Sequence, residues 1–215
     1  MFEENNNQSK PTNKPLIYAV AGVALLIVAI SGSAYAYFTA SQTSDTINGT
    51  TLDVKLDKPT VKLVSSTGTK GEGLIPIYDG SVTGHTTNQL TTAVNSTHKC
   101  VDTNNYTVCK VYEITINNSG SSSTSINTSI TLGGNATNVT WAKMTDATTF
   151  KALKDANNSF LDQNVTLAGS GSTKQYFVIY LKNTGGDQTT ADAGKNITGT
   201  VTVTASTGST IEATF

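Results

Sequence analysis

The chain has 215 residues, enough for one sizeable domain and a targeting segment. Its formal net charge is −1 and charged residues make up 13% of the sequence, about half the usual share for a soluble domain. Such a surface has no field to attract nucleic acid or anionic lipid, so the sequence predicts no nucleic-acid partner. Abundant Thr favours strands, and abundant Gly, Asn and Ser favour turns, so the composition predicts an all-β domain.

The N-terminus has the order of a secretory signal. A polar stretch with two lysines precedes the uncharged run LIYAVAGVALLIVAI, and small residues follow. Ala34 and Ala36 fit the A-x-A pattern, which predicts that a signal peptidase cuts between Ala36 and Tyr37. The alternative is an uncleaved membrane anchor, because residues 16–38 are long enough to span the bilayer as a helix. Under both interpretations the domain is extracellular or at the cell surface.

Three parts are therefore expected along the chain. Residues 1–36 form the signal peptide or membrane anchor, residues 37–47 form an N-terminal arm, and residues 48–215 form one domain. Neither an internal repeat nor a Pro-rich linker suggests a second domain.

Alternating apolar and polar residues predict short strands through the third part. The first is TTLDVKL, where Leu52, Val54 and Leu56 alternate with polar residues. Residues 74–78, LIPIY, form a short apolar run that its proline confines to an edge or a bulge. Further strands are predicted in VCKVYEITINNSG, TSINTSITLGG, NVTWAKM, NITGTVTVTAS and STIEATF.

Two segments carry more specific expectations. KQYFVIYLKN (174–183) is apolar on both faces, which predicts a central strand. Residues 145–160 are expected to form the one helix, with Asp146 as N-cap and Phe150 and Leu153 at helical spacing. Many short amphipathic strands predict a two-sheet β-sandwich of jelly-roll or immunoglobulin-like type with one short helix, and Trp141 in its core.

The two cysteines, Cys100 and Cys109, lie close together in sequence. Outside the cell such a pair indicates a disulfide first. The alternative is zinc bound together with His98 and His85, but the spacings of known zinc motifs are absent. The sequence therefore favours the disulfide and predicts no metal.

Catalytic motifs are missing. The chain has no H-E-x-x-H, no G-x-S-x-G and only two histidines, so no catalytic residues are assigned and no enzyme is predicted. No cofactor is expected either.

Several segments together resemble the TasA/camelysin family of bacterial surface proteins. In that family a dedicated signal peptidase cuts before an aromatic residue and a GTLDL-type strand follows. Here an aromatic pair, Tyr37 and Phe38, follows the signal, and NGTTLDVKL (48–56) matches the strand. KVYEITINNSGSSSTSINTSITL (110–132) and GKNITGTVTVTAS (194–206) resemble later strands, so the resemblance covers residues 34–215.

The family resemblance implies a jelly-roll subunit exported to the cell surface and, for the TasA branch, assembly into biofilm-matrix fibres. The camelysin branch has been described as a metallopeptidase, but the sequence lacks a zinc motif that would carry this over. The cysteine pair and the long polar stretch before the apolar run depart from the family pattern.

The arm suggests how such a subunit would polymerise. Open sandwiches present edge strands with unpaired backbone groups, and an arm from the next subunit can add there as a strand. Head-to-tail contacts of this kind do not close, so the partner is the protein itself in a filament, with Tyr37 and Phe38 as anchors. The alternative is a membrane-anchored surface adhesion or binding module that keeps residues 16–38 as a helix and binds through a long loop at 80–99. An extracellular hydrolase is a third hypothesis.

Overall fold

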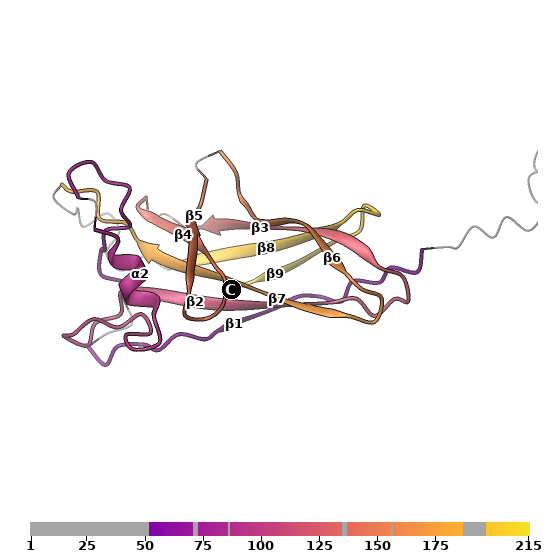
Figure 1. The fold of residues 1–215 in the computed structure, drawn as a ribbon, viewed down its shortest axis with the longest axis horizontal. Helices are drawn as coiled ribbons and strands as arrows, with labels where there is room; N and C mark the ends of the chain where they lie inside the picture. The colour runs from indigo at the N-terminus through magenta and orange to yellow at the C-terminus, as the bar shows by residue number, and fades with distance from the viewer. Residues whose placement is uncertain (1–51, 71–72, 86, 135–136, 156, 187–196) are drawn as a thin grey trace, which may run out of the picture. The chain divides into compact units, whose positions relative to one another are not determined.

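The nine strands of the computed structural model form two antiparallel sheets within residues 52–70, 73–85, 87–134, 137–155, 157–186 and 197–215, the part of the chain that is described (Figure 1). The five-stranded sheet has the order β1-β2-β7-β4-β5, and the four-stranded sheet has the order β6-β3-β8-β9. The strands are β1 (Thr60–Leu63), β2 (Cys109–Asn117), β3 (Thr124–Gly133), β4 (Val139–Met144), β5 (Phe150–Leu153), β6 (Phe160–Leu167), β7 (Ser172–Leu181), β8 (Thr198–Ala205) and β9 (Thr210–Thr214).

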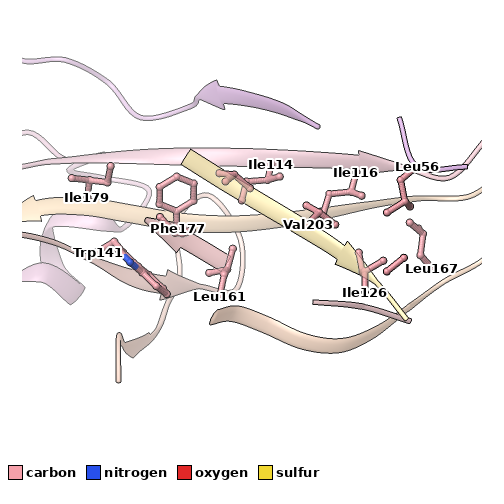
Figure 2. Close-up of a cluster of buried hydrophobic side chains, with 13 residues drawn as sticks. Leu56, Ile114, Ile116, Ile126, Trp141, Leu161, Leu167, Phe177, Ile179 and Val203 are labelled. Carbon is pink, nitrogen blue, oxygen red and sulfur yellow. The ribbon is translucent and has the colours of Figure 1, made fainter. Parts of the chain in front are cut away.

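A first hydrophobic core lies between the two sheets (Figure 2). Because side chains alternate along a strand, one face of each sheet supplies it. The five-stranded sheet contributes Ile114 and Ile116 from β2 and Phe177 and Ile179 from β7. The four-stranded sheet contributes residues such as Ile126, Leu161 and Val203. These facing side chains make the fold a β-sandwich, as expected from the sequence.

A second core covers the other face of the five-stranded sheet. The connection from β1 to β2, residues 64–108, folds over this face and is called the cap below. It contains the short helix α2 (Gln89–Val94), whose Leu90 and Val94 are buried in one hydrophobic cluster with Val178 and Tyr180 of β7. Since β7 faces a core on both sides, its continuous apolar run is explained, and the predicted central strand is confirmed.

Trp141 on β4 is confirmed as a core residue, with 1% of its surface exposed.

The prediction of a helix at residues 145–160 is wrong, because this segment contains a turn and the strand β5. Asp146 does accept hydrogen bonds from Thr148, but it closes a turn in which the Thr145 amide bonds to the Thr149 carbonyl. The chain then returns as β5, which pairs with β4 from Ala142–Leu153 to Met144–Phe150. Phe150 and Leu153 satisfy helical spacing, but pairing with β4 against the second core overrides that weak preference.

Two predicted strands exist only in part. Leu52 to Leu56 forms no ladder: a single bridge joins Leu56 to Asn118, and the first true strand begins after Pro59. Residues 74–78 likewise make one parallel bridge, between Ile77 and Lys182 at the end of β7. No sequence pattern predicted β1, β6 or α2, the last of which lies inside the expected loop at 80–99.

None of the helices in the described residues is long and apolar enough to cross a membrane. The segment proposed to do so, 16–38, lies outside the described residues.

Candidate functional site

Asn118 fixes the segment at 52–57 to the sandwich. Its side-chain Oδ1 accepts hydrogen bonds from the amides of Lys55 (3.2 Å) and Gly120 (3.1 Å). Its Nδ2 donates to the carbonyls of Ser122 (2.8 Å) and Ala168 (3.2 Å). With 1% of its surface exposed, Asn118 ties together this segment, the β2–β3 turn and the β6–β7 turn.

Close backbone approach strengthens the same junction. The Ser122 amide donates to the Asp53 carbonyl at 3.0 Å, and the Ser119 amide donates to the Lys55 carbonyl at 2.8 Å. A Cβ built on Gly120 would overlap the carbonyl oxygen of Asp53, so only glycine permits this contact. The first described residues after the arm are therefore held firmly at one end of the sandwich.

The outer edge of β9 is an unpaired backbone edge in the described part of the chain. Phe215 and Gly199 exchange both backbone hydrogen bonds, and the register continues through Val201–Ala213. In an antiparallel pair the hydrogen bonds alternate along the strand. The amides and carbonyls of Thr210, Glu212 and Thr214 consequently point away from β8.

Half-buried apolar side chains lie along the same side of the sandwich. β9 contacts β1, the edge strand of the other sheet, so both sheets end here. Val61 on β1 and Ile211 on β9 pack on the first core but stay partly exposed. Phe215 lies 5.0 Å from the ring of Tyr112 between ring centroids. We call this side of the molecule the β1–β9 seam; it offers backbone groups and apolar surface together.

The edges away from the seam, β5 and β6, are less regular. The β3–β6 pairing shifts register twice, and Asn164 of β6 has the positive φ of 54°. The β4–β5 pairing shifts between Lys143 and Met144. Such irregularities oppose the addition of another strand.

The disulfide predicted between Cys100 and Cys109 is confirmed, and it staples the cap to the start of β2. Both cysteines are fully buried in the second core. They are therefore not zinc ligands. His85 stacks on Tyr78 with ring centroids 4.3 Å apart, and among the described residues no three His, Cys, Asp or Glu side chains form a metal-binding group.

A buried carboxylate anchors the cap to β7. Asp79 accepts hydrogen bonds from the Tyr180 hydroxyl (2.7 Å) and the Ser81 hydroxyl (2.6 Å), and Lys182 Nζ lies 4.0 Å away. Burial alone would raise the pKa of Asp79, but these hydrogen bonds and the lysine charge outweigh it and lower the pKa. Burial and the neighbouring carboxylate raise the pKa of Tyr180.

A pocket of about 390 Å³ opens on the cap. Its walls come from the 75–77 segment, from α2 and from the disulfide-closed loop. The apolar walls are formed by Ile75, Pro76, Ile77, Ala93, Val101 and Val108. Polar side chains in the lining, called the polar rim below, include Gln89, His98 and Asp102. Binding through loop 80–99 was expected only under the alternative function, and the other walls come from the segments that directly flank this loop in sequence, 75–77 and 101–108.

The remaining predicted site residues, Ala34, Ala36, Tyr37 and Phe38, lie outside the described residues, as does the rest of the arm. Cleavage and the role of the arm stay predictions. The structure adds Asn118 and the β9 edge, neither of which the sequence analysis singled out. In the sequence, Asn118 was only part of the predicted strand segment VCKVYEITINNSG.

Comparisons with known proteins give little. No family model and no curated protein match this chain. Among solved structures, a FixG-related protein from Vibrio parahaemolyticus is similar over 74% of this chain and 94% of that chain, with 12% sequence identity and a TM-score of 0.31. A likeness at this level carries no argument about function.

Proposed function

We propose that the protein is an exported structural subunit of extracellular or cell-surface fibres of the biofilm-matrix type. In this proposal the arm at 37–47 of one subunit adds as a strand to the β9 edge of the next. The observation that carries the proposal is the β1–β9 seam, where an unpaired strand edge and half-buried apolar side chains coincide. We propose no catalytic role.

The position of the 52–57 segment supports this assembly. The Asn118 junction holds the chain shortly after the arm, so the arm would start from a fixed point on its own subunit. A donor strand held this way joins subunits head to tail, and contacts of this type extend without closing. Burial of Tyr37 and Phe38 on the neighbour would contribute roughly 1.5–3 kcal/mol each.

We also propose that the sandwich is of the immunoglobulin-like type. The orders β1-β2-β7-β4 and β3-β8-β9 correspond to the A-B-E-D and C-F-G sheets of constant-type immunoglobulin domains, with β5 and β6 added. The strand order thus favours the immunoglobulin-like alternative over the jelly roll. Support for the TasA/camelysin resemblance comes from the sequence signatures alone.

Two experiments test assembly. A chain that begins at Asn48 should keep its thermal transition but stay monomeric in sedimentation at concentrations where the chain from Tyr37 forms filaments. Replacing both Tyr37 and Phe38 by Ala should raise the concentration needed for assembly more than tenfold, since 1.4 kcal/mol already gives that factor. Equal polymerisation of the shortened chain would refute the role of the arm. Failure of that chain to fold would place the arm in its own sandwich.

The acceptor edge has its own matched pair of variants. Glu212→Pro removes an outward amide from β9, whereas Glu212→Ala keeps it, and both lose the hydrogen bond to Thr202. Electron microscopy should show filaments for Glu212→Ala and none for Glu212→Pro. If both variants assemble equally, the β9 edge is not the acceptor.

A membrane-anchored binding module is the second candidate, favoured by the pocket on the cap. Long connections of this kind often carry function. Mass spectrometry of the native N-terminus separates the two: a start at Tyr37 favours the fibre, and an intact start favours the anchor.

A further inference from the structure

The pocket on the cap has the features of a preformed small-molecule site. Its volume of about 390 Å³ falls in the usual range for ligand pockets. Ile77, Ala93 and Val108 of the lining belong to the second core together with α2 and the disulfide, so these walls are part of buried structure. The site does not involve the β9 edge and is independent of filament assembly.

The walls specify an apolar ligand body. The groups that face the cavity from the 75–77 segment and from Val101 and Val108 are aliphatic. No Phe, Tyr or Trp belongs to the described lining residues, so the stacking platform on which sugars and nucleobases are commonly bound is not provided.

The rim specifies the charge of the ligand's polar end. Asp102 Oδ1 accepts the amides of Asn104 (3.0 Å) and Tyr106 (2.8 Å), while its Oδ2 has no hydrogen-bond partner in the described part of the chain. No Lys or Arg is among the described lining residues to neutralise this carboxylate. The imidazole of His98, also at the rim, makes no hydrogen bond with any described residue.

We propose that this pocket binds small amines: molecules with an apolar body that enters between the aliphatic walls and an ammonium group that pairs with Asp102. A carboxylate or phosphate head is disfavoured because it would lie against the unpaired oxygen of Asp102. The aliphatic walls give affinity, and the acidic rim selects the head group.

Three probes with closely matched bodies test the proposal: 2-phenylethylamine, 2-phenylethanol and 3-phenylpropionate. The full-length chain, labelled at isoleucine methyl groups, is titrated with each probe and followed by NMR. Ile75 and Ile77 report on the pocket, and Ile114 and Ile126 in the first core serve as internal controls. The amine should bind in the millimolar range and shift only the first pair. It should bind about two- to fivefold more tightly than the alcohol, as for a partly exposed ion pair, and the carboxylate should bind most weakly.

Two variants test whether Asp102 causes the preference for the amine and whether the probes bind in the pocket. Asp102→Asn keeps the oxygen that accepts the two amides but removes the charge, so the amine and the alcohol should bind equally. Thr92→Tyr places a large side chain at the pocket from an exposed position on α2 and should abolish the shifts with every probe. Unchanged Ile114 and Ile126 signals establish that both variants are folded. The proposal is overturned if no probe shifts Ile75 or Ile77, if the amine preference survives Asp102→Asn, or if binding survives Thr92→Tyr.

Discussion

Replacing Asn118 by Ala should loosen the end of the sandwich from which the arm would emerge. The substitution removes four side-chain hydrogen bonds, two accepted and two donated, at a residue with 1% of its surface exposed. It leaves the amides of Lys55 and Gly120 and the carbonyls of Ser122 and Ala168 without these partners.

The expected loss of stability follows from the four hydrogen bonds that Asn118→Ala removes. A hydrogen bond contributes roughly 0.5–1.5 kcal/mol net, and buried groups left unsatisfied cost more. Because water can reach part of the junction after the change, the free energy of unfolding should fall by about 2–5 kcal/mol. In a domain of this size that lowers Tm by at least about 4 °C.

Thermal denaturation measures the loss of global stability, and amide hydrogen exchange shows which part of the domain opens more readily. Exchange at Lys55 and Gly120 should accelerate more than exchange in β2 and β7, because the junction opens locally. The control is Ser119→Ala in the same turn, where an exposed hydroxyl donates to the Lys55 carbonyl (3.2 Å) and to Asp57 (2.9 Å), and the change should stay within about 0.5 kcal/mol. If Asn118→Ala costs no more than Ser119→Ala, the junction does not hold the 52–57 segment.

Three further outcomes are expected. Gly120→Ala should destabilise by about 1–3 kcal/mol in denaturant melts, since its Cβ would overlap the Asp53 carbonyl, whereas Gly73→Ala, with no atom within 4 Å, should be nearly neutral; equal effects would contradict the close approach. Replacing both Cys100 and Cys109 by Ala should lower the free energy of unfolding by about 2–3 kcal/mol, and non-reducing peptide mapping of the parent chain should recover the linked pair rather than two free thiols. Because folding lowers the pKa of Asp79 from 3.8, its contribution to stability is complete above that pH and is lost as the pH falls through the lower folded value. Urea melts should therefore show a smaller loss of stability in acid for Asp79→Asn than for the parent chain, and an identical loss would refute this role.

The sequence by itself determined the features that depend on local pattern. Period-two alternation identified most strands of the two sheets, and the doubly apolar run at 174–183 identified β7 as central. The spacing of Cys100 and Cys109, in a chain predicted to be exported, was enough to favour their disulfide. In each case the signal lies within a few residues, where side-chain periodicity or chain length directly limits the structure.

Tertiary structure alone decided the rest. Residues 145–160 have helical spacing, yet pairing with β4 makes part of them β5, because a partner distant in sequence outweighs local propensity. Asn118 looks like an ordinary turn residue until the turns around Ser122 and Ala168 close on it. The pocket unites residues 75–77, α2 and the disulfide loop only when the cap folds over the five-stranded sheet. Which edge stays unpaired likewise depends on strand order, a property of the whole chain that no local pattern encodes.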